Sequence, residues 1–366
     1  MYGLGMGRMG GIGGVPSLAA QISAMFAGSQ QGAWYDPSDM ATLFQDAAGA
    51  TPVTTIEQPV GRMLDKSGRG NHASQATAAS RPVLSARTNL LLATDALATQ
   101  SVTLPATVHT LSFTGTGTVT LSGVSVAGPL VGTGASNRVS LTFTPTAGVL
   151  TLTVTGSVTL SQLETGTTAT RYQSVVNAST YDSIGFPMYL RFDGVDDGLA
   201  TAAINFSATD KLVVWAGFRK NIDALGLLYE SSSDVSGNNG SFGYYTTGAS
   251  NFSLRATVAQ EILQNSLANA TNYVSSAELD LTAATQVLRT KARVNAGAYA
   301  SQSGGGPTTA GGTFGNYPLF IGRRNNASLP LSGNLYSLII RGAASSASEI
   351  AAAERYVASK TGVLLP

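Results

Sequence analysis

The sequence predicts an all-β protein, and three observations lead to this prediction. Apolar residues alternate with Thr, Ser or Gly in segments such as VTLSGVSV, RVSLTFTP and GVLTLTVTGSVTLSQLE. Gly, Pro and Asn interrupt these segments every few residues, which is typical of short strands joined by turns. Helical periodicity is visible only near the two ends of the chain. A chain of 366 residues is long enough to form two β-sandwiches.

The composition excludes several classes of protein. The chain has 21 Lys and Arg against 20 Asp and Glu, 11% charged residues, 43% apolar residues and no Cys. Without Cys there is neither a disulfide scaffold nor a Cys-ligated metal site. Near-zero net charge with ample apolar content argues against disorder and against a broad nucleic-acid surface, which needs clustered basic residues. We therefore expect no nucleic-acid partner.

Residues 1–33 form an N-terminal segment in which 7 of the first 14 residues are Gly. Bulky residues alternate with these glycines, so an extended strand would carry side chains on one face and bare backbone on the other. Such a strand suits insertion into a groove or sheet edge of a partner protein, so we expect an anchor, with a floppy tail as the alternative. The anchoring side chains would be Tyr2, Leu4, Met6, Met9 and Ile12.

A short helix is expected after this strand. Ser17 is a suitable N-cap, and Gly28 is a suitable end. Pro16 and Gln21 interrupt the surrounding apolar stretch, so we expect neither membrane insertion nor a secretion signal. The apolar face of this helix would pack on its own domain or bundle with further copies of the chain; for the oligomer contact we choose Leu18, Ile22, Met25 and Phe26.

The chain is also expected to end in a helix. Ser346 and Glu349 form the capping-box pattern, Lys360 lies in the expected last turn, and Gly362 follows it. Between the two helices, residues 87–176 differ sharply in composition from both flanks. They are dominated by Thr, Val, Leu, Ser and Gly, and about 90 residues of this kind suffice for a small jelly roll.

Three stretches resemble the concanavalin A-like (laminin-G-like) jelly roll that is found in many phage virion proteins. They are AWYDPSD at 33–39, LDKSGRGNH at 64–72 and YLRFDGVDD at 189–197, and residues 317–322 and 333–340 look like the last strands of that fold. In such proteins the DKSG loop usually runs within a few tens of residues into the FDG strand. Here 87–176 separates them, and its end, LSQLETG at 160–166, is similar to the last strand of small carbohydrate-binding-like jelly rolls of phage tail proteins.

The resemblance implies a discontinuous concanavalin A-like jelly-roll sandwich, with a second, inserted β-sandwich. The first would comprise residues 34–86 and 177–366, including the C-terminal helix. The inserted β-sandwich would occupy 87–176, and the N-terminal anchor 1–33.

Folds of this kind also include glycosidases, which need two carboxylates on one strand face. The nearest match to the hydrolytic Glu-x-Asp-x-x-Glu pattern begins at Glu278 and Asp280, but Ala283 occupies the position of the third acid. The two histidines, His72 and His109, lie in a turn cluster and a Thr-rich strand, without the glycine pattern that frames a catalytic serine. We therefore expect no enzymatic activity.

Metal and glycan sites have weaker sequence signals. Asp193, Asp196 and Asp197 offer hard oxygen ligands for Ca²⁺, although we favour turn formation and capping and expect no cofactor. Sugar binding needs flat aromatic faces beside short polar groups, and Tyr229, Tyr244 and Tyr245 lie near loops rich in Ser, Asn and Gly. Adjacent Tyr244 and Tyr245 point to opposite faces of a strand, so at most one would contact a glycan.

The resemblance implies a function as a phage virion structural protein, a tail or fibre-like surface component. It would be assembled in the host cytoplasm and reside in the virion. Its partners would be other virion proteins, further copies in a homotrimer, and host cell-surface polysaccharide. The alternative is a capsid or tail decoration protein that cements its neighbours and binds no glycan. A third hypothesis is a glycan-degrading enzyme with an unrecognised site.

Overall fold

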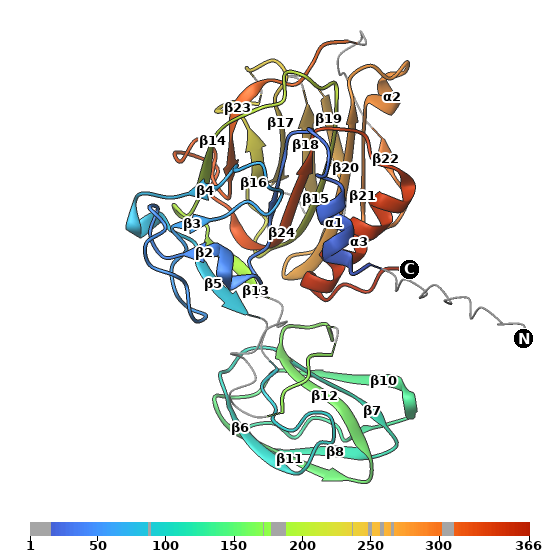
Figure 1. Cartoon of the computed structure of the whole chain (residues 1–366). Coiled ribbons are helices and arrows are strands. Elements are labelled where there is room, and N and C mark those ends of the chain that lie inside the picture. Colours follow the sequence, from blue (N-terminus) through green and yellow to red (C-terminus); the bar gives the residue numbers. More distant parts are fainter. Residues whose placement is uncertain are drawn as a thin grey trace, which may run out of the picture.

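The computed structural model describes residues 16–86, 89–170, 172–176, 188–235, 237–247, 251–256, 260–264, 267–301 and 311–366. It is an all-β structure, as the sequence predicts, with helices near both ends of the chain (Figure 1). No helix in these ranges combines the length and hydrophobicity needed to cross a membrane.

The larger sandwich consists of two antiparallel sheets. One sheet has the order β22-β21-β20-β15-β24-β13-β5, with β1 also paired to β24. Its strands are β1 (Gly32–Tyr35), β5 (Val83–Ala86), β13 (Met188–Asp193), β15 (Lys211–Lys220), β20 (Thr271–Asp280), β21 (Thr290–Val294), β22 (Ala300–Ser301) and β24 (Ser332–Arg341). The other has the order β19-β18-β17-β16-β23-β14-β4-β3-β2. Its strands are β2 (Leu43–Phe44), β3 (Arg62–Met63), β4 (Ala73–Ser74), β14 (Leu199–Asn205), β16 (Gly226–Ser231), β17 (Phe242–Thr247), β18 (Asn251–Ala256), β19 (Gln260–Gln264) and β23 (Asn316–Ile321).

The main core lies between these two sheets. Large side chains from both sheets meet there, among them Tyr35, Phe192 and Phe218 from the first and Tyr229 and Phe242 from the second. Burial of such side chains supplies most of the stabilising free energy of a sandwich. The short helices η1 (Met40–Thr42), η2 (Ala78–Ser80) and α2 (Gln286–Arg289) lie in the connections.

Two helices cover the outer face of the eight-stranded sheet. They are α1 (Leu18–Ala24) and α3 (Ala347–Thr361), which pack on each other and on Trp215 of β15. Gly217 permits the close approach of α3, because a Cβ there would lie 2.7 Å from Thr361 and 2.8 Å from Val357. The Ser346–Glu349 capping box begins α3, and Gly362 ends it with φ of 75°, as the sequence predicts.

The structure contradicts the predicted oligomer contact on α1. Ser17 does cap this helix, through a hydrogen bond from the Ala20 N–H at 3.2 Å. However, Ile22, Met25 and Phe26 are buried against the α3 side of the larger sandwich, and Leu18 packs at the edge of the same cluster. The helix therefore uses its apolar face within its own chain, the other alternative that the sequence left open.

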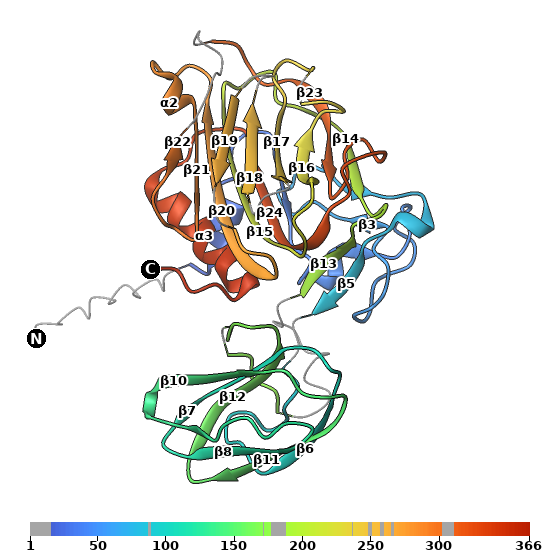
Figure 2. The ribbon, with the colours of Figure 1, turned by 180° about the vertical axis from the view of Figure 1, so that it is seen from behind.

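The remaining strands form a smaller sandwich (Figure 2). Its sheets have the orders β10-β7-β12 and β6-β11-β8-β9. Their strands are β6 (Gln100–Leu104), β7 (His109–Gly115), β8 (Thr118–Gly123), β9 (Leu130–Val131), β10 (Gly134–Phe143), β11 (Gly148–Thr155) and β12 (Val158–Thr165). The chain leaves the larger sandwich at Ala86 and re-enters it at Met188, and these two residues are paired between β5 and β13. The smaller sandwich has a core of its own around Leu111, Phe113 and Leu150.

Candidate functional site

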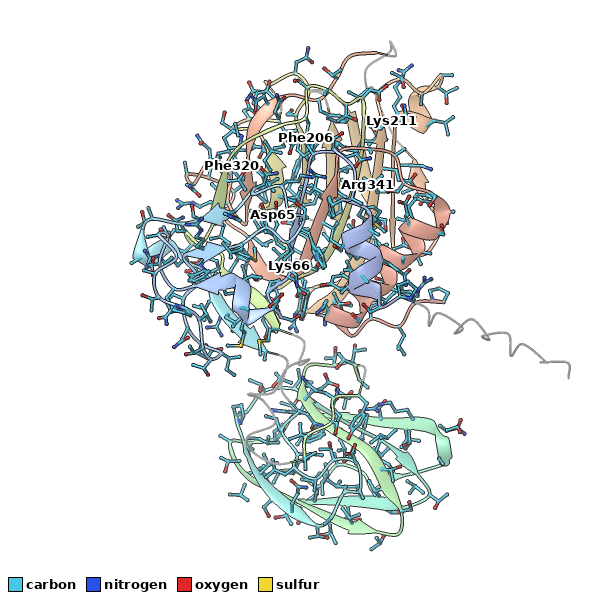
Figure 3. All side chains as sticks on the ribbon, in the orientation of Figure 1. Asp65, Lys66, Phe206, Lys211, Phe320 and Arg341 are labelled. Atoms are coloured by element: carbon cyan, nitrogen blue, oxygen red, sulfur yellow. The ribbon has the colours of Figure 1, made fainter. Side chains whose placement is uncertain are left out.

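The LDKSGRGNH loop organises the larger sandwich internally. The Asp65 carboxylate is buried and accepts hydrogen bonds from the Trp34 N–H (2.9 Å), the Ser67 N–H (2.8 Å) and hydroxyl (2.7 Å), and the Asn71 N–H (3.0 Å). Figure 3 shows Asp65 and Lys66 within the larger sandwich. Arg69 donates to the carbonyls of Phe26 and Gly28 and so fixes the end of α1. This motif has a structural role.

The YDPSD stretch joins the beginning of the fold to its last helix. Buried Asp36 lies 3.2 Å from the Lys360 ammonium and 3.4 Å from that of Lys66, and it accepts a hydrogen bond from the Tyr356 hydroxyl at 2.5 Å. Burial alone would raise the pKa of Asp36, but the two ammonium groups and the hydroxyls of Ser38 and Tyr356 outweigh burial and lower this pKa. Asp36 therefore stays charged and stabilises the contact between β1 and α3.

The three aspartates of the FDGVDD turn do come together. One carboxylate oxygen from each of Asp193, Asp196 and Asp197 lies within 4.8 Å of the others. Protein donors occupy these carboxylates: Asp193 accepts the Val195 N–H at 2.7 Å, and Asp197 accepts the Asp193 N–H at 3.0 Å. Burial, with help from the neighbouring carboxylates, raises the pKa of Asp197 to about 6. The turn explains the three acids, and Ca²⁺ binding there stays a prediction.

The residues that we considered for hydrolysis are held in ion pairs. Glu278 lies 3.1 Å from the Lys291 ammonium, and Asp280 lies 2.7 Å from that of Lys211. Neither histidine has a serine hydroxyl as a hydrogen-bond partner among the described residues. His72 accepts the Asp65 N–H at 3.0 Å, and buried His109 contacts the Thr107 carbonyl at 2.7 Å.

The predicted glycan-binding tyrosines are buried, and this contradicts a stacking role for them. Tyr229 and Tyr244 lie in the main core with ring centroids 5.9 Å apart, and their side chains are 1% and 0% exposed. Tyr245 points to the other face of β17, but it is also buried, in a cluster with Leu227 and Phe320. Their rings fill the fold and present no face to a sugar. The anchoring residues Tyr2, Leu4, Met6, Met9 and Ile12 lie outside the described residues.

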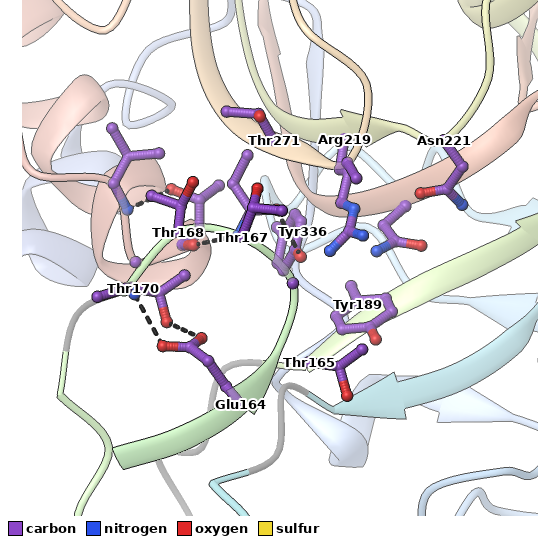
Figure 4. A pocket seen from close by; sticks show the side chains of 18 of the residues that line it. Glu164, Thr165, Thr167, Thr168, Thr170, Tyr189, Arg219, Asn221, Thr271 and Tyr336 are labelled. Atoms are coloured by element: carbon purple, nitrogen blue, oxygen red, sulfur yellow. Dashed lines mark hydrogen bonds between the residues drawn. The ribbon is translucent and has the colours of Figure 1, made fainter. Parts of the chain in front are cut away.

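A cavity with a volume of about 490 Å³ lies between the two sandwiches (Figure 4). Strands β13, β15, β20 and β24 of the larger sandwich form one wall, and residues 164–170 at the end of β12 form the opposite wall. The last residue of α3 and the three residues after it, 361–364, line one side. We call this cavity the cleft. Its volume lies within the range of small-molecule binding sites.

A row of polar residues crosses the wall of the cleft that belongs to the larger sandwich. Arg191 of β13 is directly opposite Asn334 of β24, which is opposite Arg219 of β15, which is opposite Asn272 of β20. Residues directly opposite each other in antiparallel strands project to the same face of a sheet. The register therefore places two guanidinium groups and two amides side by side along the cleft.

Two tyrosines lie beside this row. The rings of Tyr189 and Tyr336 have centroids 4.9 Å apart. The Tyr336 hydroxyl donates to the Asn272 side chain at 3.0 Å, and Asn272 donates to the Thr361 carbonyl at 2.7 Å, so these groups form the fixed base of the wall. Tyr189 is only half-buried. Burial raises its pKa, while Arg219 and Arg191 act in the opposite direction.

The opposite wall is a loop rich in threonine. Thr165, Thr167 and Thr168 are exposed, and Figure 4 shows Thr167 and Thr168 opposite the Arg219 side of the cleft. Glu164 holds this loop in place: it accepts hydrogen bonds from the Thr170 N–H at 2.9 Å and hydroxyl at 2.5 Å, and from the Gln162 amide at 2.5 Å. The loop therefore offers hydroxyl groups on a fixed backbone.

Sequence reasoning did not identify the residues of the cleft. In both strand segments apolar and polar residues alternate, and this period of two indicates that Arg219 shares a face with Trp215 and that Arg191 shares a face with Tyr189. Nothing local shows which strands are neighbours, so the row could not be assembled from the sequence.

Neither the protein-family models nor the curated proteins include a match to this chain. Among solved structures, Trypanosoma rangeli sialidase in complex with the inhibitor DANA is 13% identical, with a TM-score of 0.34, 46% of this chain covered and 27% of the sialidase. The native heptameric SAP-like pentraxin from Limulus polyphemus is 12% identical, with a TM-score of 0.34 and coverage of 44% and 78%. The Ruminococcus gnavus IT-sialidase CBM40 bound to α2,3-sialyllactose is 9% identical, with a TM-score of 0.30 and coverage of 41% and 95%. The chain therefore overlaps each of these structures only in part.

Proposed function

We propose that the protein is a non-enzymatic structural protein of a phage virion that binds host cell-surface glycans in the cleft between its sandwiches. The observation that carries the glycan proposal is the wall of the cleft. It combines the half-buried Tyr189 ring with the amides of Asn334 and Asn272, opposite exposed threonine hydroxyls. Sugars bind to this combination, because C–H groups pack on an aromatic face while short polar side chains reach the hydroxyls.

The virion part of the proposal is supported by the AWYDPSD, DKSG and FDG motifs and by the glycine-rich N-terminal segment. In a virion many copies would bind one cell, so weak contacts at each cleft would add up through avidity. Trimerisation and docking through residues 1–30 belong to this proposal. A trimer would have to use surfaces other than the buried face of α1.

Glycan binding is tested by a substitution on the exposed threonine loop that places a large side chain in the cleft. Thr168→Trp places a large ring in the cleft without touching a core, and Thr103→Trp is a matched control on an exposed position of β6 that does not line the cleft. We expect Thr168→Trp to lower binding to host cells and to a glycan array at least tenfold, and Thr103→Trp to leave it unchanged. If the parent protein binds neither while it remains on particles, decoration is the function. If both variants bind normally, the cleft is not the site.

The anchor is tested by deletion of residues 2–15. We expect the shortened protein to keep its melting temperature, because the Ser17 cap, α1 and the cluster that α1 forms with α3 are all retained, and to be absent from purified particles. Normal incorporation would contradict the anchor. Immunogold microscopy of the parent protein then shows whether it resides in the tail or on the capsid.

A further inference from the structure

Arg219 lacks a partner within the described part of the chain. No side-chain hydrogen bond or ion pair connects it to another described residue, and its Nε–H is buried without an acceptor. Other arginines of the same sandwich are paired: Arg293 lies 2.7 Å from Glu354, and Arg324 lies 2.7 Å from Glu230. A half-buried guanidinium without an acceptor is costly, because lost water contacts are not replaced.

The electrostatics of the cleft favour an anion as the missing partner. Arg191, the second guanidinium of the row, is paired with Glu57 at 2.9 Å on its exposed side. The described lining contains one acid, Glu164, whose oxygens are engaged by Gln162 and Thr170. The positive charge of Arg219 is thus not neutralised from within the cleft. Figure 4 shows its side chain extending into the cleft toward Tyr189.

The groups beside Arg219 indicate what kind of anion would bind. A guanidinium has a planar fork of N–H donors that matches the two oxygens of a carboxylate. Tyr189 lines the cleft near Arg219 and offers an aromatic ring for C–H contacts (Figure 4). Asn334 lies directly opposite Arg219 in the row, and its amide makes no side-chain hydrogen bond to a described residue. A ligand that uses all three groups carries a carboxylate, a ring with C–H faces and hydroxyls.

We propose that the cleft binds acidic saccharides, with the sugar carboxylate paired to the Arg219 guanidinium and the sugar ring against Tyr189. This inference rests on the proposed glycan-binding function and names the substrate class of the same site. Sulfated and phosphorylated sugars also carry anions, so the test distinguishes them from carboxylated ones.

The experiment begins with the full-length protein on an array of neutral, carboxylated, sulfated and phosphorylated glycans. The best carboxylated glycan and its carboxyl-reduced counterpart are then titrated calorimetrically. We expect the carboxylated form to bind at least tenfold more tightly, and Arg219→Met to weaken its binding roughly tenfold to a hundredfold while binding of the reduced form is kept. Arg219→Lys should restore part of the preference. Arg355→Met, on an exposed position of α3 outside the cleft, is the matched control.

A second variant tests the charge without altering the wall of the larger sandwich. Thr168→Glu adds a negative charge to the exposed loop opposite Arg219 and should abolish the preference for carboxylated glycans, whereas Thr103→Glu adds the same charge on β6 and should not. This arm remains informative if Arg219→Met fails to fold.

The outcomes separate the two proposals. Equal binding of the carboxylated and reduced forms, a preference that survives both Arg219→Met and Thr168→Glu, or a stronger response to sulfated or phosphorylated glycans overturns the acidic-saccharide inference and leaves glycan binding in place. Binding to no glycan class overturns glycan binding as well.

Discussion

Each of the two sandwiches contains a buried polar side chain that links distant segments of the chain, a carboxylate in the larger sandwich and an amide in the smaller one. In the larger one, the Asp65 carboxylate accepts four hydrogen bonds, from Trp34, Ser67 and Asn71. In the smaller one, the buried Asn89 amide donates to the carbonyls of Ser161 (2.9 Å) and Gln173 (3.0 Å), and its oxygen accepts the N–H groups of Leu91 (3.2 Å) and Leu163 (3.1 Å). Each side chain joins segments that are distant in the sequence.

The difference shows that the hydrogen-bond donors and acceptors around each position determine whether a carboxylate or an amide fits there. Around Asp65 every neighbouring group is a donor, so an ion with two acceptor oxygens fits. Around Asn89 two neighbours are donors and two are acceptors, which only a neutral amide satisfies. Exchange of Asp and Asn at either position therefore places like groups against each other, and the following experiments test this comparison.

The largest effect is expected for Asn89→Asp. A carboxylate there would face the carbonyls of Ser161 and Gln173 without water, so we expect a loss of about 3–5 kcal/mol of unfolding free energy at pH 7. The loss should be smaller at pH 5, where a protonated Asp can donate one hydrogen bond. Both Trp residues lie in the larger sandwich, so tryptophan fluorescence reports only on the unfolding of that sandwich. The unfolding transition of the smaller sandwich should therefore shift in circular dichroism, while the fluorescence transition stays constant.

Asn137→Asp, on an exposed position of β10, adds the same charge and serves as the control. The unfolding transitions seen by tryptophan fluorescence and by circular dichroism could instead shift together for Asn89→Asp. The two sandwiches would then unfold as one unit, and the effects of Asn89 and Asp65 could not be assigned to separate sandwiches.

A smaller effect is expected for Asp65→Asn. One of the two oxygens becomes an amide that faces a donor, so we expect a loss of about 2–4 kcal/mol of unfolding free energy. Here the tryptophan fluorescence transition should shift, because Trp34 itself donates to Asp65. Asp210→Asn, whose side chain is 36% exposed and lies 3.6 Å from the Lys211 ammonium, should change stability little. Equal effects of the two variants would show that the four acceptor contacts of Asp65 are not needed.

The smallest effect is expected for Asp36→Asn, and it should depend on pH. At pH 7 the variant loses the ion pairs of a buried carboxylate, but the side chains of Lys66 and Lys360 remain 20% and 21% exposed and can be solvated, so we expect a loss of about 1–2 kcal/mol. The pKa of Asp36 is below its ordinary value of 3.8 in the folded protein, so its stabilising effect is present above pH 3.8 and disappears as the pH falls through the folded-state pKa. The difference in unfolding free energy between parent and variant, measured from pH 7 to pH 2.5, should therefore shrink below pH 4. A difference that does not change with pH would contradict this role.

Local patterns predicted the secondary structure well and the candidate site poorly. The capping box at Ser346 and the cap at Ser17 depend on neighbours within four residues, so the sequence shows them directly. The tyrosines at 229, 244 and 245 were chosen because they lie near polar loops, but a loop position does not reveal whether a ring points into the core. Burial depends on the opposite sheet, which comes from other parts of the chain.

By itself, the sequence determined the all-β class, the two terminal helices and the motif loops, because alternation, turn residues and caps act over short distances. Only the tertiary structure decided where a ligand could bind. The row from Arg191 to Asn272 is assembled from four strands that become neighbours through long-range pairing, and the threonine loop of the smaller sandwich faces it. The pairing order of strands follows from the burial of whole sheets, and no short stretch of sequence contains it.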